Sequence, residues 1–358
     1  LRESSNPQAQ FIWAMLRNAF HYAAVTLEGI ADTARDIDLA MRWGYGAKQG
    51  PFELWQQAGW KQVAEWVKAD IDAGKALSKA PLPAWVFDGR DGVHTADGSW
   101  SPSKKTYVPL IKLPVYDRQY FREDVVGSGA PDGATAGKTL FEDAAIRLWT
   151  LDDEVVIASI KSKMHTISAE VTSGLAKGLE IAEAGYKGLV IWSYDGPFSA
   201  GADLQSMMPA FMAGGGKAIA PFEKQLQDFM LSLRYSNVPT VAAMHGLALG
   251  GGCELAVHCA KRVAAMETYV GLVEVGVGLI PGGGGLAYQA RRAAELLETS
   301  KGISGQTPVD LMAYIKEFFQ ASAMAKVATS GIEARKFGYL LDGDIVVPNK
   351  DEILYVAI

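Results

Sequence analysis

The segment Gly246-Leu247-Ala248-Leu249-Gly250-Gly251-Gly252-Cys253-Glu254-Leu255 decides the fold of the second half of this chain. It follows the run 240–245, which has the apolar composition of a buried strand. It leads into the apolar run 253–262, which we expect to be helical. The consecutive glycines between them permit a tight turn and a close approach of the backbone to another group. The segment therefore predicts a strand, an open turn and a helix.

Strands and helices are predicted to alternate around this segment. The expected strands are 144–150, 155–160 and 188–193, and the expected helices are 171–184 and 218–236. The first two strands flank a polar turn and are expected to form a hairpin. Alternation of this kind is typical of an α/β fold with stacked units, in which ligands bind at strand-to-helix turns. We expect one such domain over residues 139–358.

The first part of the chain has a different pattern. Asn6 and Pro7 form a plausible N-cap and first-turn pair, and helical periodicity returns at 36–43 and 52–71. Residues 1–76 are therefore expected to form an all-α lobe. Residues 77–138 are rich in Pro, Gly, Ser, Asp and Lys, and we interpret them as an irregular connector that packs on a neighbour through its aromatic side chains.

Composition excludes several function classes. The 358 residues carry 34 Lys and Arg against 40 Asp and Glu, so no general attraction to nucleic acid or to an anionic membrane is expected. No apolar run reaches the ~18 residues of a membrane span, which favours a cytoplasmic location. The two cysteines, Cys253 and Cys259, lack zinc-ligand spacing and are expected in the core, with no metal site. Because the chain begins at Leu1, it is interpreted as a fragment of a longer polypeptide.

Two acids accompany three glycine-rich turns, at 198–204, 246–255 and 274–285. Glu254 and Glu274 lie 20 positions apart in apolar surroundings. Small residues at a strand-to-helix turn can aim backbone N–H groups at a developing oxyanion. Two carboxyl groups near such a site can act as general acid and base. This combination predicts acid–base chemistry on a carbonyl compound.

Residues ~140–348 resemble the enoyl-CoA hydratase/isomerase, or crotonase, family through these turns. The resemblance implies a crotonase-like superhelix of stacked ββα units that follows the N-terminal all-α lobe in the sequence. It also implies that the backbone N–H groups of Ala202 and Gly251 bind the thioester oxygen, and that Glu254 and Glu274 are the catalytic acids. Possession of both acids resembles the hydratases and implies hydration of 2-enoyl-CoA in fatty-acid β-oxidation.

The resemblance also implies how CoA is held. Lys163 matches the family's lysine that meets the CoA phosphates, the carbonyl of Ala200 would meet the adenine, and Asp203 is assigned to the same ligand. The chain departs from many relatives at Gln205, where they have lysine, and at His165, where they have asparagine. CoA is expected as part of the substrate, with no tightly bound cofactor.

Three alternatives remain open at this stage. An enoyl-CoA isomerase or a CoA-thioester hydrolase would use the same oxyanion site without requiring both acids. A catalytically silent protein would keep the affinity for acyl-CoA and lose the carboxylate chemistry.

Residues ~10–70 are similar to the C-terminal domain of 3-hydroxyacyl-CoA dehydrogenases, through the segments 36–46 and 50–54. No strand-borne G-x-G-x-x-G motif occurs in the chain, so NAD would be bound only by an upstream domain. The chain thus resembles the carboxyl half of a bifunctional β-oxidation protein. The expected partners are an acyl-CoA substrate and either a second copy of the chain or a dehydrogenase domain.

Overall fold

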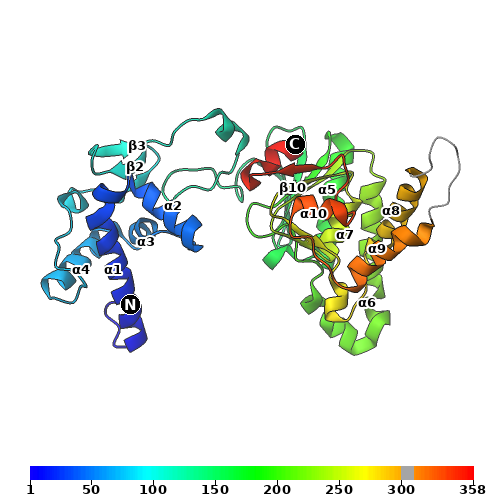
Figure 1. Ribbon diagram of the computed structural model, residues 1–358, viewed down its shortest axis with the longest axis horizontal. Helices are drawn as coiled ribbons and strands as arrows, with labels where there is room; N and C mark the ends of the chain where they lie inside the picture. The colour runs from blue at the N-terminus through cyan, green and yellow to red at the C-terminus, as the bar shows by residue number, and fades with distance from the viewer. Residues whose placement is uncertain (300–309) are drawn as a thin grey trace. The chain divides into compact units, whose positions relative to one another are not determined.

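The computed structural model describes residues 1–299 and 310–358 of the chain (Figure 1). These residues form two compact units. Unit 1 comprises Leu1–Tyr116 and Arg122–Pro131, and unit 2 comprises Asp117–Phe121 and Asp132–Ile358. Each unit has its own hydrophobic core, so each is described by itself.

Four helices open unit 1: α1 (Pro7–Ile30), α2 (Ala34–Tyr45), α3 (Pro51–Gln57) and α4 (Trp60–Asp72). The Asn6 side chain accepts a hydrogen bond from the Gln8 amide at 2.8 Å, as the cap prediction requires. The single helix expected over 52–71 is interrupted, because Gly59 adopts a φ of 98° that helical residues do not have. The helical character of this region is otherwise as predicted.

Residues 77–131 are more ordered than the expected connector. They contain a short helix η1 (Ala84–Phe87) and a three-stranded antiparallel sheet of β1 (His94–Thr95), β2 (Gly98–Ser101) and β3 (Thr106–Val108). Val86 and Val93 are buried in the same cluster as Trp55 of α3 and Trp60 of α4. The predicted packing on a neighbour is confirmed, and that neighbour is the helical region.

A buried polar chain joins the sheet to the helices. Asp38 of α2 accepts hydrogen bonds from the amides of Phe52 and Glu53 at the start of α3, and lies 2.6 Å from His94 Nε2. The other ring nitrogen of His94 lies 2.8 Å from Ser99 Oγ. Polar groups buried this deeply need partners, and here they satisfy one another. The Asp38 network therefore fixes the position of β1 and β2.

Unit 2 is built on a seven-stranded mixed sheet in the order β12-β10-β8-β7-β6-β5-β4. The strands are β4 (Lys138–Glu142), β5 (Ile146–Thr150), β6 (Val156–Ile160), β7 (Leu189–Ile191), β8 (Thr240–Met244), β10 (Lys261–Ala265) and β12 (Ile345–Val347). β4, β5 and β6 pair antiparallel, and the strands from β6 to β12 pair parallel. The predicted hairpin is the pair β5 and β6.

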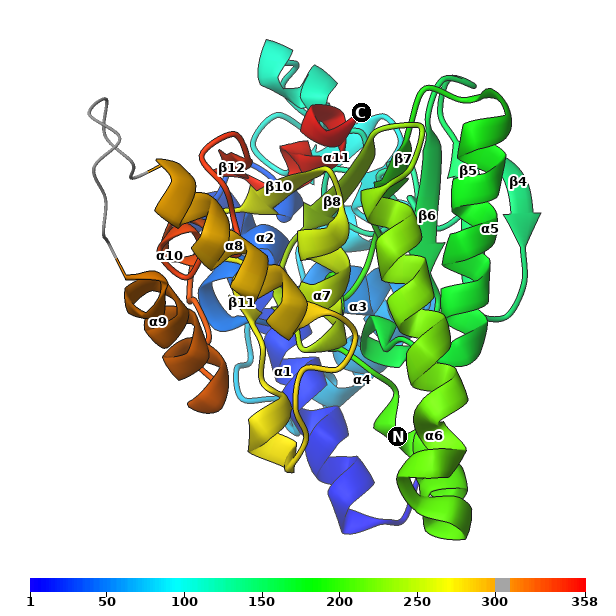
Figure 2. The same ribbon diagram turned by 90° about the vertical axis from the view of Figure 1, so that its right-hand side faces the viewer.

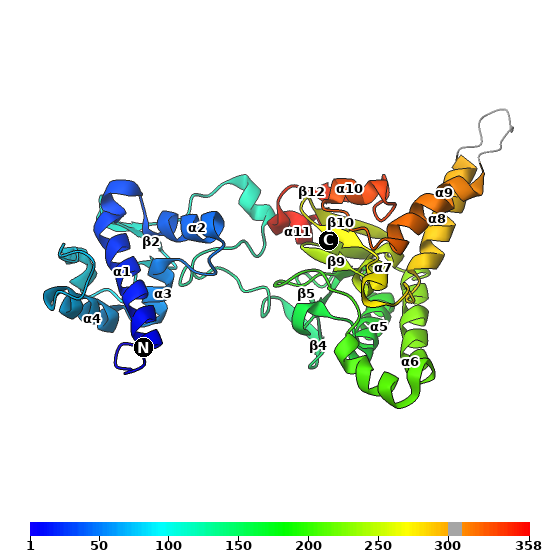
Figure 3. The same ribbon diagram turned by 60° about the horizontal axis from the view of Figure 1, so that its bottom comes forward.

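Successive residues of the central strands face two different cores. Leu189 and Ile191 of β7 pack in the core under the helices α5 (Ala169–Gly185), α6 (Leu204–Arg234) and α7 (Gly251–His258). Val190 faces the opposite core, which also contains residues of α11 (Ile353–Ala357). Figures 2 and 3 show α5 and α6 lying side by side. Burial on both faces explains the uninterrupted apolar runs of these strands.

A second, smaller ladder crosses the turns that leave the main sheet. β9 (Leu247–Leu249) pairs parallel with β11 (Tyr269–Gly271), and isolated bridges join Ser199 to Ala248 and Ile167 to Ala202. Each turn of the chain thus runs from a main-sheet strand through this ladder into a helix. The predicted α/β class and the stacked ββα superhelix are confirmed.

The remaining elements of the described chain are short helical turns and the C-terminal helices. They are η2 (Pro114–Arg118), η3 (Lys163–His165), η4 (Glu274–Val277), α8 (Gly285–Thr299), α9 (Leu311–Ala323), α10 (Gly331–Lys336) and η5 (Lys350–Glu352). Within the described residues, none of the helices combines the length and apolarity that crossing a membrane requires.

Two helix predictions need correction. The helix expected over 253–262 ends at His258, because residues 261–265 pair with β8 and β12 as strand β10. The helix expected over 218–236 begins earlier, at Leu204, and is kinked at Gly215, where φ is 60°. The prolines and glycines of its first half obscured the helical pattern.

Candidate active site

A cavity of about 170 Å³ lies where three turns of unit 2 meet. Its walls come from the turn before α6, helix α6 itself, the first turn of α7, the short helix η4 and the glycine segment before α8. The apolar part of the lining consists of Leu204, Met207, Leu226, Val273, Val277, Leu279 and Ile280. Five of the residues predicted from sequence line the same cavity: Ala200, Ala202, Gly251, Glu254 and Glu274.

Glu254 lies in the first turn of α7 and is only 2% exposed. Its Oε1 accepts a hydrogen bond of 2.9 Å from the backbone amide of Gly285, at the start of α8. Burial, reinforced by the nearby Glu274, raises the pKa of Glu254 from 4.5 to about 8, although the Gly285 amide opposes the change. Glu254 is therefore largely protonated at neutral pH.

Glu274 begins η4 and has a different environment. Both of its carboxylate oxygens are buried, and no described group makes a well-formed hydrogen bond to either. Burial raises the pKa of Glu274, and the amides of Val273 and of Glu274 itself offset part of that effect. A buried carboxylate without partners is costly unless it serves a ligand. Glu274 is thus available to a molecule that enters the cavity.

The two acids influence each other, and a third acid joins them. Glu274 raises the pKa of Glu254, so the protons on these carboxyl groups belong to the coupled set. Glu223 of α6 also lines the cavity. No local sequence feature distinguishes Glu223 from any other helical glutamate, so it was not among the predicted site residues.

The backbone amides of Ala202 and Gly251 belong to adjoining turns. On either side of Ala202, the Ile167 amide donates to the Gly201 carbonyl and the Asp203 amide donates to the Ile167 carbonyl. The Ala202 amide is therefore directed away from this bridge. The Gly251 amide is at the N-terminus of α7, where N–H groups lack helical partners. Within residues 1–299 and 310–358, neither amide donates a hydrogen bond. A Cβ on Gly251 would lie 3.3 Å from Ala202 N, so the two amides lie close together.

The predicted CoA contacts are more dispersed. Lys163 lines a separate hollow of about 450 Å³, together with the buried His165. Its turn adjoins the cavity region, because the Ala200 amide donates to the Met164 carbonyl. The Asp203 side chain does not line the cavity; its Oδ1 accepts from the amides of Gln205 and Ser206 and caps α6.

The part of the chain that contains these turns, buried acids and unbonded amides matches a known sequence family. Residues 154–306 match the Enoyl-CoA hydratase/isomerase family. This hydratase/isomerase region contains all the predicted site residues, and its crotonase-like fold agrees with the ββα superhelix of unit 2.

Two curated relatives extend the similarity beyond this region, and a third matches a shorter part of the chain. A probable 3-hydroxyacyl-CoA dehydrogenase of Bacillus subtilis is 31% identical over 99% of this chain and 42% of its own length. A putative fatty acid oxidation complex trifunctional enzyme of Rickettsia felis is 30% identical over 85% of this chain and 38% of its own length. The mitochondrial methylglutaconyl-CoA hydratase of Mus musculus is 37% identical over 34% of this chain and 40% of its own length. The chain spans about two fifths of the length of these relatives.

A solved structure of an enoyl-CoA hydratase from Geobacillus kaustophilus aligns with 58% of this chain and 70% of its own, at 19% identity and a TM-score of 0.47. A second, from Thermoplasma volcanium, aligns with 61% of this chain and 77% of its own, at 22% identity and a TM-score of 0.47.

Proposed function

We propose that the hydratase/isomerase region adds water to 2-enoyl-CoA thioesters and forms 3-hydroxyacyl-CoA. The observation that carries the proposal is one cavity that holds two raised-pKa glutamates, Glu254 and Glu274, beside the unbonded amides of Ala202 and Gly251. Hydration needs both kinds of group, since a proton must move at each end of the C=C bond while charge develops on the thioester oxygen.

The coupled protonation of Glu254 and Glu274 defines which of them acts as the base and which as the acid. The ionised member of the Glu254–Glu274 pair takes a proton from water, whose oxygen bonds to the β-carbon. The protonated member gives a proton to the α-carbon, so the pair ends with the same number of protons. The amides of Ala202 and Gly251 hold the enolate oxygen between these events, a contact whose removal typically costs roughly 10²–10³ in rate.

The surroundings of the cavity support a fatty-acyl substrate. Apolar side chains such as Met207, Leu226 and Ile280 suit an alkyl chain. We assign the CoA part to the side of Ala200 and Lys163, with the Lys163 ammonium facing the phosphates. A place in fatty-acid β-oxidation is proposed because the Rickettsia relative is named for that process.

The direct test is the loss of the enoyl thioester absorbance when the chain is mixed with 2-enoyl-CoA substrates of C4 to C16. We expect saturable turnover and a 3-hydroxyacyl-CoA product by mass spectrometry. Absence of water addition for every chain length would refute the proposal.

The same samples separate the alternatives. An isomerase would instead convert 3-enoyl-CoA to 2-enoyl-CoA without a mass change, and a hydrolase would release free CoA thiol. Binding of acyl-CoA without any of these products would indicate a non-catalytic role.

Two further assignments concern the larger relatives. We propose that unit 1 contributes to a 3-hydroxyacyl-CoA dehydrogenase module, since the Bacillus relative with that name aligns over 99% of the chain. NAD would then act through residues outside this chain, and a second copy or the dehydrogenase module would be the protein partner. Sedimentation of the chain with and without such a module tests this assignment.

A further inference from the structure

Glu223 reaches the cavity from an element that carries no predicted site residue. It lies on α6, whereas Glu254 starts α7 and Glu274 starts η4. Its carboxylate rests against the backbone of Gly282, where an added Cβ would be only 2.2 Å from Glu223 Oε1. The neighbouring Gly283 lies against Glu254, with 2.6 Å between its added Cβ and Glu254 Oε2. Two carboxyl groups thus pack against consecutive glycines of one wall.

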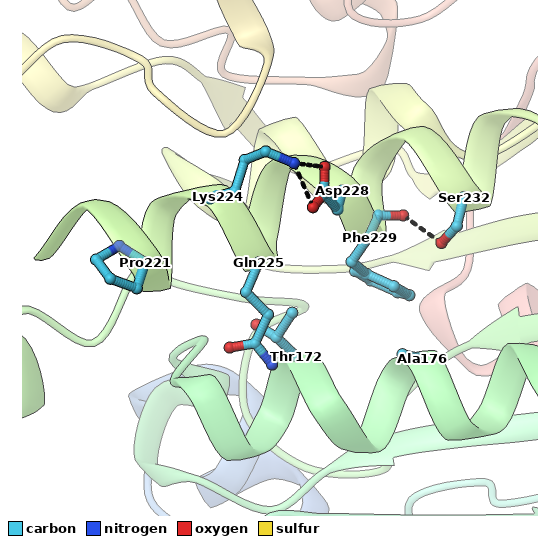
Figure 4. Close-up of a pocket in the computed structure, with 8 residues that line it drawn as sticks. All are labelled: Thr172, Ala176, Pro221, Lys224, Gln225, Asp228, Phe229 and Ser232. Atoms are coloured by element: carbon cyan, nitrogen blue, oxygen red, sulfur yellow. Dashed lines mark hydrogen bonds and ion pairs between the residues drawn. The ribbon is translucent and has the colours of Figure 1, made fainter.

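Among the residues that the structure describes, no positive charge balances these acids inside the cavity. The described lining residues include three glutamates and no Lys, Arg or His. His258 packs behind the wall, at Gly284, and burial lowers the pKa of its ring, so it is neutral near pH 7. Lys224, the next residue on α6, is paired with Asp228 of the same helix, and both line a separate hollow beside α6 (Figure 4).

An extra negative charge in such a space makes ionisation of the other two groups harder. Burial raises the pKa of Glu223 itself, and the charge of Glu223 raises the pKa values of Glu254 and Glu274. Like charges in a confined site cannot all ionise together, and one of the groups keeps a proton. The charge of Glu223 therefore affects the protonation of the Glu254–Glu274 pair, and the proposed hydration needs one protonated and one ionised member of that pair.

We propose that Glu223 is a positioning residue of the site, whose negative charge keeps one proton on the Glu254–Glu274 pair near neutral pH. It does not need to touch the substrate, and its effect passes through the other two acids. The catalytic meaning of this role rests on the proposed hydration, but the proton balance of the three carboxyl groups exists without substrate.

Glu223→Gln tests the role because it removes the charge and preserves the size of the side chain. Asp228→Asn is the matched control, since it makes the same charge change on the same helix but outside the cavity (Figure 4). Glu223→Asp keeps the charge and should keep most of the wild-type behaviour. Melting temperatures of all three variants show whether each is folded.

Two readouts are needed. The first is a ¹³C NMR titration of the glutamate side-chain carboxyl carbons in the free protein, with resonances assigned through Glu254→Gln and Glu274→Gln. We expect Glu223→Gln to move the titration of the pair to lower pH, and Asp228→Asn to leave it in place. The second is the pH profile of kcat for 2-enoyl-CoA hydration, whose alkaline limb should move in the same direction.

The outcomes separate the two proposals. Unchanged titration of the pair in Glu223→Gln overturns the role of Glu223, even in an active hydratase. Equal shifts in Glu223→Gln and Asp228→Asn also overturn it, because they would reflect net charge alone. A wild-type chain without hydration refutes the proposed function, while the NMR titration still decides the proton balance. If Glu223→Gln does not fold, a normal titration in Glu223→Asp is the supporting result and an acid-shifted one is contradictory.

Discussion

The backbone amide of Gly285 donates a 2.9 Å hydrogen bond to Glu254 Oε1, across 31 positions of sequence. This contact joins the first turn of α7 to the first turn of α8 and holds the Glu254 carboxyl group in one orientation. Glu274 has no such support, because both of its oxygens are buried without a described partner. One acid is thus fixed by the protein and the other is available to a ligand, which leads to different expectations for the two.

Replacement of either acid by glutamine should abolish most hydration. We expect kcat to fall by about 10²–10⁴ in both Glu254→Gln and Glu274→Gln, the usual contribution of general acid–base catalysis. Binding of acyl-CoA, measured by calorimetry, should persist because the amide has the size of the carboxyl group. Near wild-type turnover in either variant would contradict the two-acid mechanism.

Stability should separate the same two variants. Glu274→Gln removes a buried carboxylate that makes no well-formed hydrogen bond to a described group, so its melting temperature at pH 8 should equal or exceed that of the wild type. A clear drop in the melting temperature would show that Glu274 has a structural partner in solution.

The free energy of unfolding should depend on pH through Glu254. Its folded pKa of about 8 lies above the ordinary 4.5, so the folded state holds the proton more tightly than the unfolded state. The stabilisation from this proton is fully present below pH 4.5, declines as the pH rises toward 8, and is lost above about pH 8. The decline is at most about 1.4 kcal/mol per pH unit for one group. Urea unfolding at pH 5 to 9 should show a shallower decline in Glu254→Gln, and equal slopes would argue against the raised pKa.

Gly251 and Gly252 should respond differently to alanine. The Cβ of Gly251→Ala would lie 3.3 Å from Ala202 N and cover the proposed oxyanion site, so we expect a loss of roughly 10²–10³ in kcat with a nearly unchanged melting temperature. The Cβ of Gly252→Ala would lie 2.7 Å from both Ser199 Cβ and the Ser199 carbonyl oxygen, and this variant should lose stability. Full turnover in Gly251→Ala would remove the oxyanion assignment.

A buried ion pair should dominate the stability of one sheet edge. Asp344 accepts from Arg262 Nε at 2.7 Å and from the amides of Arg262 and Leu341, with almost no solvent contact. Asp344→Ala should lower the free energy of unfolding by about 3–5 kcal/mol, because the Arg262 charge is left buried alone. Glu154→Ala breaks the exposed pair with Lys187 and should cost at most about 1 kcal/mol. Equal losses in urea unfolding would refute this distinction.

Local sequence determined much of this architecture. Apolar runs at 144–150, 155–160 and 240–245 predicted strands that the structure contains, because residues buried on both faces must be apolar throughout. The turn that bears Gly251 and Glu254 was evident because its glycines and its acid are contiguous. The strands β1 to β3 were missed, since two to four residues among prolines and glycines carry no clear periodicity.

Only the tertiary structure decided how these parts meet. The apolar run after Cys253 has no helix breaker, and α7 ends at His258 because the next residues gain parallel partners in β8 and β12. The support of Glu254 by the Gly285 amide and the presence of Glu223 in the cavity depend on contacts between segments far apart in sequence. Residue type and spacing determined which groups can carry the chemistry. Their burial, and therefore their protonation, was decided by the packing of α6, α7 and the Gly282–Gly285 wall around one small cavity.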